Sequence, residues 1–232
     1  MAGILEGLRV VEMGHWVAVP SVCALLADWG ADVLKIEPLT GDAARGLGQG
    51  GDTAGEYFVN GVPVNWRIEL HNRGKKSLAV DASKEAGREI IYKTIQKADV
   101  FATNYEFASL KKLRLDYAQL KEHNPRLVYA LLTGYGTIGP DKDERGFDYA
   151  AAWAHSGIQH LLGQPGDVPP AQRGGMMDRN AGFHLLSGVP AALLHREKTG
   201  QGEEIHVSLY HAGVWTLAAD TQAALLGVPL PK

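Results

Sequence analysis

The chain has 232 residues, of which 45% are hydrophobic and 21% charged, and its formal net charge is −3. This length and composition are typical of a globular protein with one sizeable hydrophobic core. The slightly acidic balance excludes a broadly basic surface of the kind that binds nucleic acid or anionic membrane, although a local basic patch can still hold a small anion.

A single cysteine, Cys23, excludes an internal disulfide and a thiolate zinc cluster. The nine histidines follow no metal-binding spacing such as H-E-x-x-H, so we expect no metal site. The apolar runs are shorter than a membrane span, and the opening MAGILEGLRVVEM lacks the charged segment and cleavage site of a signal peptide. We therefore expect a cytoplasmic protein that binds neither membrane nor nucleic acid.

The first two thirds of the chain alternate short runs of branched apolar residues with segments of helical periodicity. Strands are predicted at 8–13, 32–37, 76–81, 99–104 and 126–136, and helices at 20–30, 83–99 and 116–124. Ser83 is expected to cap the second of these helices. A strand, a helix and a strand within the first 37 residues are typical of a βαβ unit. The sequence therefore predicts an α/β fold with an open, mostly parallel, Rossmann-like sheet flanked by helices.

The last third is mainly helical. The pattern predicts a helix at 148–162, a loop rich in glycine and proline at 163–175, a long helix at 180–199, and a strand that leads into a helix over 202–226. Pro190 lies inside the long helix and should kink or break it.

Most local motifs in the chain have a structural explanation. The segment GLGQGG at 46–51 matches G-x-G-x-x-G, but it does not lie in a strand-to-helix turn, so a flexible loop is the better interpretation. Cys23 fits the apolar pattern of the first helix and is expected in the core. Ser156 and Ser187 lie in no G-x-S-x-G nucleophile elbow.

Polar residues follow several of the predicted strands, at the edge where α/β sheets bind ligands. They are His15, the segment 37–45, Asn104 with Tyr105, and the glycine-containing segment 134–136. A basic segment, 72–76, precedes the third strand and reaches this edge only if its loop folds back. Basic residues here can hold phosphates, and a solvated loop is an equally good explanation.

Asp178 is the one acid in GGMMDRNAGFHLL, residues 174–186. One interpretation is a helix N-terminal acid that the helix dipole favours. The other is a nucleophilic carboxylate. Spacing alone does not separate the two, and in either case we expect a carboxylate beside a helix N-terminus to stay ionised.

Six ordered segments of the chain resemble the family III CoA-transferases, which include formyl-CoA transferase, crotonobetainyl-CoA:carnitine CoA-transferase and the α-methylacyl-CoA racemases. The segments are GLRVVEMGHWVAVPSVCALLADWGADVLKIEP, GDAAR, NRGKKSLAVD, ADVFATNY, HNPRLVYALLTGYGTIGP and GMMDRNAGFHLLSGVPAALLHREKTGQGEEIHVSLY. The resemblance extends over nearly the whole chain.

This resemblance implies a transfer of CoA from an acyl-CoA to a carboxylic acid through a thioester between Asp178 and CoA. Backbone groups of glycine-rich segments would stabilise the oxyanions, and the candidates are Gly134, Tyr135, Gly136, Gly174 and Gly175. The residues that match the family's CoA contacts are His15, Val17, Ala18, Pro38, Arg73, Lys75, Lys76, Asn104, Tyr105 and Lys112. No metal is implied.

Three departures from the family pattern bear on function. Phe147 replaces the proton-accepting histidine of the racemases, which disfavours a racemase. Pro38 stands where an arginine is common, and Phe107-Ala108 replaces a usual Pro-Gly. Trp16, Trp66 and Trp153 suggest a bulky apolar or aromatic acyl group, and burial in the core is the alternative explanation.

The chain is also shorter than members of this family. We expect residues 1–200 to form the CoA-binding large domain, and 201–232 to form a strand and helix leading toward a small domain that this chain lacks. Relatives form interlocked dimers, so the resemblance implies a homodimer or a second chain that supplies the missing part, unless the chain is a fragment of a longer protein. The alternatives to a CoA-transferase are a non-catalytic CoA-binding protein or subunit and, less favoured, a racemase-type enzyme.

Overall fold

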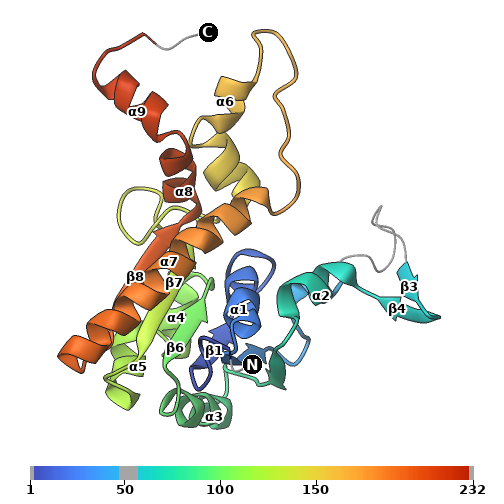
Figure 1. Cartoon of the computed structure of the whole chain (residues 1–232), viewed down its shortest axis with the longest axis vertical. Helices are drawn as coiled ribbons and strands as arrows, with labels where there is room; N and C mark the ends of the chain where they lie inside the picture. The colour runs from blue at the N-terminus through green and yellow to red at the C-terminus, as the bar shows by residue number, and fades with distance from the viewer. Residues whose placement is uncertain (1–2, 47–56, 230–232) are drawn as a thin grey trace.

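The computed structural model describes residues 3–46 and 57–229. Its centre is a sheet of six strands in the order β5-β2-β1-β6-β7-β8, in which every neighbouring pair is parallel (Figure 1). The strands are β1 (Arg9–Met13), β2 (Asp32–Glu37), β5 (Lys76–Ala79), β6 (Val100–Thr103), β7 (Val128–Thr133) and β8 (Glu204–Ser208). The predicted open α/β sheet is therefore confirmed, and β8 belongs to the same sheet as the earlier strands.

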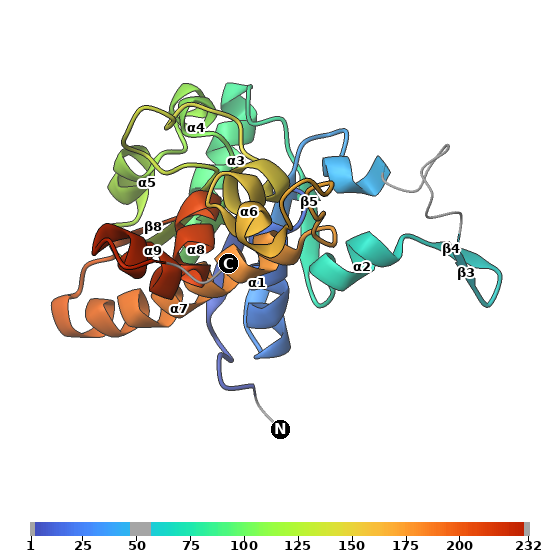
Figure 2. The ribbon, with the colours of Figure 1, turned by 90° about the horizontal axis from the view of Figure 1, so that it is seen from above.

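Helices cover both faces of the sheet (Figure 2). One face is covered by α1 (Ala18–Asp28) and α7 (Met176–Thr199), and the other by α3 (Glu85–Ile95), α4 (Phe107–Leu113) and α5 (Tyr117–His123). Successive strand residues point to opposite faces, so Val128 packs with the first layer and Tyr129 with the second. This double burial explains why the strands read as nearly continuous apolar runs.

The strand order reverses between β1 and β6. From β1 the chain builds outward through β2 to β5, and it then returns to β6 and builds outward through β7 to β8. The connections that leave the carboxyl ends of β1 and β6 therefore go to opposite faces of the sheet. Such a switch point leaves a crevice that α/β proteins commonly use for ligands.

The segment between β2 and β5 contains elements that the sequence pattern does not predict. They are a 3-10 turn (Ala43–Gly46), the antiparallel hairpin β3 (Tyr57–Val59) and β4 (Val62–Val64), and α2 (Trp66–Asn72). Asn60 and Gly61 both have positive φ, which is the two-residue turn that favours tight hairpins. The hairpin and α2 project from the body of the molecule (Figure 1). Most of the GLGQGG motif lies outside the described residues.

Three local predictions were wrong. Lys84, not Ser83, precedes α3, because the Ser83 hydroxyl donates to Asp81 instead. The segment 148–162 is divided into a π-helical turn (Tyr149–Ala154) and α6 (Ile158–Leu162), with Gly157 at positive φ between them. The long helix α7 begins at Met176 and is not broken at Pro190.

Packing against the sheet and α1 keeps α7 continuous despite the missing proline N–H. Its buried face includes Leu185, Leu186 and Val189. Near its end, Arg196 pairs with Asp99 at 3.0 Å, and the Gly200 N–H donates to the Arg196 carbonyl. These tertiary contacts outweigh the local cost of the proline.

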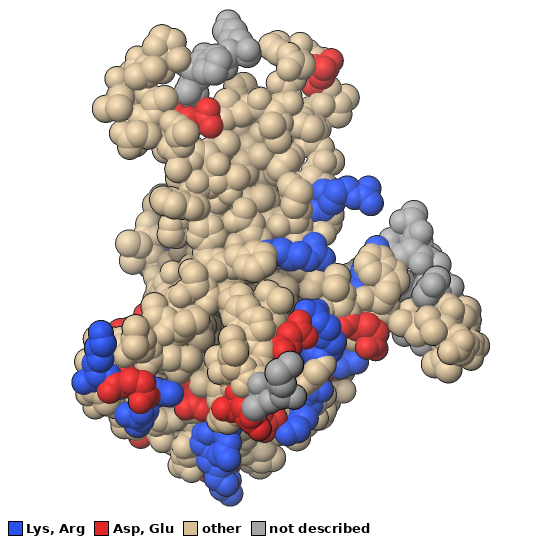
Figure 3. Space-filling view, in the orientation of Figure 1, with Lys and Arg blue, Asp and Glu red and all other residues tan. Residues whose placement is uncertain are grey.

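The end of the chain forms α8 (Leu209–Thr216) and α9 (Ala218–Leu225). Together with α6 they stand above the sheet in Figure 1, and Figure 3 shows few charged side chains on this part of the visible face. Within the part of the chain that the structure describes, no helix has the length and apolar character needed to cross a membrane.

Candidate active site

A cleft of about 350 Å³ opens at the carboxyl ends of β1, β6 and β7, beside the switch point of the sheet. The loop after β1, the start of α4, the segment 142–147 and the first turn of α7 form its walls. Its lining includes His15, Trp16, Ala18, Asn104, Tyr105, Phe107, Leu132, Gly134, Phe147, Asp178 and Leu209.

Asn104 fixes the loop after β1 against the end of β6. Its side-chain oxygen accepts the His15 N–H at 3.0 Å, and its amide nitrogen donates to the His15 carbonyl at 2.9 Å. The His15 ring meets the Tyr105 ring edge to face, with the centroids 5.0 Å apart. Burial lowers the pKa of His15, and the nearby Asp42 offsets this only in part, so the ring is neutral at pH 7.

A buried ion-pair cluster of Glu12, Lys35, Asp42 and Lys75 supports the same loop from below. The Lys35 ammonium lies 2.7 Å from Glu12 Oε1 and 2.9 Å from Asp42 Oδ2, and the Lys75 ammonium lies 2.5 Å from Glu12 Oε2. Asp42 also accepts the backbone N–H of Trp16 at 3.2 Å. The cluster therefore ties the loop after β1 to β2 and to the start of β5.

Asp178 lies in the first turn of α7 and faces the cleft. Gly175, with φ 68°, precedes the helix, and a Cβ at this position would lie 3.0 Å from the Val17 side chain. A glycine here therefore lets the beginnings of α7 and α1 approach each other.

The environment of Asp178 favours the protonated carboxyl. Burial and, to a smaller extent, the charge of Asp148 raise the pKa of Asp178 to about 7, and Arg179 opposes the rise. The expectation that this carboxylate stays fully ionised was wrong, because removal from water outweighs the helix N-terminus.

Asp148, which the sequence analysis did not single out, is 4% exposed and precedes the π-helical turn. Burial raises the pKa of Asp148, and nearby polar groups, foremost the backbone N–H of Asp178, oppose the rise. Asp148 therefore lies against the start of α7, next to Asp178.

A close backbone contact brings Asp148 to this position. A Cβ on Gly134 would lie 2.8 Å from the Gly146 Cα, and one on Gly146 would lie 2.7 Å from the Gly134 Cα. The two glycines allow the segment that leads to Asp148 to lie directly on the end of β7. No local sequence signal indicates this contact.

Of the five candidate oxyanion residues, Gly134 lines the cleft. The Gly136 N–H donates to Thr133 Oγ1 at 2.9 Å, and the Tyr135 ring packs against His155 and Tyr210. Gly174 is exposed, and Gly175 is buried just before α7.

The structure brings half of the candidate CoA-binding residues together. His15, Ala18, Asn104 and Tyr105 line the cleft. Pro38 lines an adjoining hollow of about 640 Å³ that shares His15 and Tyr105 with the cleft. Val17 directly precedes α1.

The candidate basic residues lie elsewhere. Lys75 belongs to the buried ion-pair cluster, and Arg73 pairs with Asp28 on the surface. Lys76 pairs with Asp32 at 2.6 Å, at the amino ends of β5 and β2 and thus at the opposite edge of the sheet. Lys112 is exposed on α4 and lines neither hollow. The basic residues that do line the cleft, Lys142 and Arg145, were not predicted.

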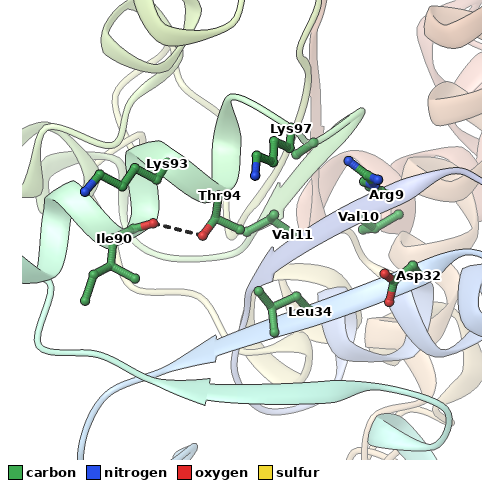
Figure 4. A pocket seen from close by; sticks show the side chains of 10 residues that line it. Arg9, Val10, Val11, Asp32, Leu34, Ile90, Lys93, Thr94 and Lys97 are labelled. Carbon is green, nitrogen blue, oxygen red and sulfur yellow. Dashed lines mark hydrogen bonds between the residues drawn. The ribbon is translucent and has the colours of Figure 1, made fainter.

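A separate groove of about 550 Å³ lies between α3 and the strands β1 and β2 (Figure 4). Arg9 and Asp32, the first residues of these strands, mark its position at the amino edge of the sheet, away from Asp178. In the described ranges, 3–46 and 57–229, no three His, Cys, Asp or Glu residues gather as potential metal ligands.

Asp178 therefore places a half-buried carboxyl in a crevice beside the switch point of the sheet. The sequence profile of CoA-transferase family III matches residues 5–232. The chain belongs to CoA-transferase family III.

Individual relatives agree with this assignment. The chain is 36% identical over 228 residues to (R)-2-hydroxy-4-methylpentanoate CoA-transferase of Clostridioides difficile, covering 98% of this chain and 56% of that protein. It is 37% identical over 221 residues to cinnamoyl-CoA:phenyllactate CoA-transferase of Clostridium sporogenes, covering 95% and 52%. The chain spans about half the length of these curated relatives.

The fold agrees as well. The crystal structure of a CAIB/BAIF family protein from Brucella suis is similar over 100% of this chain and 60% of that one, with a TM-score of 0.89 and 33% identity. Membership of the family therefore rests on both sequence and fold.

Proposed function

We propose that this chain carries the nucleophile of a CoA-transferase, which moves CoA from an acyl-CoA donor to a carboxylic acid acceptor. The observation that carries the proposal is Asp178, a half-buried carboxyl at the start of α7 that lines a cleft beside the switch point. Membership of CoA-transferase family III supports the reaction class.

The first half of the proposed reaction loads the enzyme. The Asp178 carboxylate attacks the carbonyl carbon of the donor thioester, and the carbon–sulfur bond breaks to give a mixed anhydride and the CoA thiolate. The thiolate then attacks Cγ of Asp178 and releases the donor acid as a carboxylate. The product is a thioester between Asp178 and CoA.

The second half reverses these steps with another acid. The acceptor carboxylate attacks Cγ of Asp178 and expels the CoA thiolate. The thiolate attacks the acceptor's carbonyl carbon in the new anhydride, which releases the Asp178 carboxylate and the new acyl-CoA. No proton or electron is gained or lost overall, so no redox cofactor is needed.

The remaining residues of the site have roles consistent with this scheme. We assign the backbone around Gly134 to the oxyanions and the hollow lined by Pro38, His15 and Tyr105 to the nucleotide part of CoA. We assign Arg73, Lys75 and Lys76 to ion pairs within the protein rather than to phosphate binding.

The relatives' greater length bears on the assembly. We propose that residues other than those that the structure describes complete the substrate site, since the match covers about half of each relative's length. The second candidate function, CoA binding without transfer, follows from the same observation.

The two functions differ in whether Asp178 becomes covalently modified. The chain would be incubated with several acyl-CoAs, treated with hydroxylamine, and analysed by intact mass and peptide mapping. A hydroxamate at Asp178 is expected. It should be absent from Asp178→Ala and retained in Asp143→Asn, which alters an exposed acid of the same cleft. Binding of acyl-CoA without modification of Asp178 would instead support the non-catalytic function.

A further inference from the structure

Trp16 and Phe147 are two of the aromatic side chains that line the same cleft as Asp178. Trp16 comes from the loop after β1, and Phe147 from the segment that precedes the π-helical turn. Their rings meet edge to face, with the centroids 6.1 Å apart and an interplanar angle of 80°. Phe147 is 63% exposed, although the next residue, Asp148, is buried. These two rings form the aromatic wall of the cleft.

The position of Trp16 is imposed by its surroundings. Its φ is 64°, a left-handed conformation that a bulky residue rarely adopts. Its N–H donates to Asp42, which the buried ion-pair cluster holds in place. Strain of this kind persists only where surrounding structure enforces it, and it is common at ligand sites.

The other two tryptophans considered from the sequence have different environments. Trp153 is 5% exposed, and its indole N–H donates to the Pro170 carbonyl at 2.8 Å, so it belongs to the core. Trp66 is exposed on α2, outside the cleft. Trp16 is therefore the one of these three that faces Asp178.

The charges of the cleft disfavour a second carboxylate on the acyl group. The described lining contains four acids, namely Glu106, Asp143, Glu144 and Asp178. Lys142 and Arg145, its Lys and Arg side chains, are exposed, as are Glu106, Asp143 and Glu144, and Arg145 lies 3.1 Å from Glu106. A dicarboxylic acyl group would bring its free carboxylate close to like charges without a buried cation to pair with it.

The floor of the cleft is apolar. Ala18, Leu132 and Leu209 are each at most 3% exposed and line it beneath the aromatic wall. An aliphatic or aromatic side chain gains from burial against such a surface, whereas a charged one loses its hydration.

We propose that Trp16 and Phe147 receive the side chain of the acyl group, and that the substrates are monocarboxylic acids with a bulky apolar or aromatic side chain. Dicarboxylic acids should be poorer substrates. This inference rests on the proposed CoA transfer through Asp178 and specifies its substrate class.

The test compares three donors with the full chain: 3-phenylpropanoyl-CoA, succinyl-CoA and acetyl-CoA. The rate at which CoA is loaded onto Asp178 is measured by intact mass spectrometry. It should be at least about tenfold higher with 3-phenylpropanoyl-CoA than with succinyl-CoA. Trp16→Ala should slow loading from 3-phenylpropanoyl-CoA by about tenfold and from acetyl-CoA far less, since acetyl has no side chain to bury. Trp16→Phe should keep most of the rate.

Trp66→Ala is the matched control, because it removes an exposed tryptophan outside the cleft. Thermal melting of each variant separates loss of folding from loss of binding. Equal or faster loading from succinyl-CoA would overturn the inference. The inference would also be overturned if folded Trp16→Ala lost the same fraction of its loading rate with all three donors.

A binding measurement separates failure of this inference from failure of the proposed function. Dissociation constants of 3-phenylpropanoyl-CoA and succinyl-CoA for Asp178→Asn, measured by calorimetry, need no chemistry at Asp178. If no donor loads Asp178, the proposed transfer fails. A preference for the phenylpropanoyl thioester that Trp16→Ala removes would still establish the acyl site, and an absent preference would overturn it.

Discussion

Asp148 is a buried acid directly beside Asp178 at the start of α7, and each residue influences the pKa of the other. The Asp178 N–H is among the groups that act on the Asp148 carboxylate, while the charge of Asp148 raises the pKa of Asp178. The pair keeps the proposed nucleophile close to half-protonated near neutral pH.

The rate of loading onto Asp178 should therefore depend on pH. The attacking species is the carboxylate, so the rate should rise with pH around a midpoint near 7, the pKa of Asp178. Rapid-quench mass analysis with one donor between pH 5 and 9 measures this profile. A midpoint near 4 would show that burial does not perturb the group.

Asp148→Asn should move this midpoint to lower pH. Asparagine keeps the shape of the side chain but carries no negative charge. Ionisation of Asp178 then costs less free energy, so its pKa falls. The midpoint should remain above the ordinary aspartate value, because burial is the larger cause of the shift. Asp143→Asn, at an exposed position of the cleft, is the control and should leave the midpoint unchanged.

Asp178→Asn should stabilise the folded chain at alkaline pH. Because the folded pKa of about 7 exceeds the ordinary aspartate value of 3.8, the folded state binds more protons than the unfolded state between these values, and stability falls as pH rises. The gain from the substitution should be small near pH 4 and reach at most about 4 kcal/mol at pH 8.

Urea denaturation at the two pH values measures this gain. A gain that is the same at both pH values would mean that the titration of Asp178 is not its source. The unfolding transitions must be two-state for the comparison to be valid.

Lys75→Ala should destabilise the chain by about 3–5 kcal/mol, because it leaves Glu12 buried with one partner fewer. Arg73→Ala should change stability by less than about 1 kcal/mol, since its ion pair with Asp28 is exposed. Denaturation combined with CoA titration of the folded variants checks both. A large loss of CoA affinity in folded Arg73→Ala would show that Arg73 belongs to the CoA-binding site.

The sheet could be predicted from sequence because its signal is local. The strands at 100–103 and 128–133 are buried on both faces, so almost every residue in them is apolar. The hairpin β3–β4 was missed although Asn60-Gly61 is a turn signal, because its strands are only three residues long. The continuity of α7 through Pro190 depends on tertiary packing, which periodicity does not report.

The candidate site was harder to predict because its members meet through distant contacts. Asp148 reaches Asp178 because Gly134 and Gly146 allow two backbones to touch. Lys75 looked like a phosphate ligand, but its partner Glu12 lies 63 positions earlier in the chain. Neither relationship has a fixed spacing that a motif could encode.

The buried ion-pair cluster also constrains how this sequence can vary. Loss of any one of its four members leaves a charge in the interior without compensation, whereas coordinated replacement of the members together can be nearly neutral. We therefore expect substitutions at positions 12, 35, 42 and 75 to occur together among related sequences. Asp42 accepts the backbone N–H of Trp16, so substitutions in the ion-pair cluster should also alter the shape of the substrate cleft.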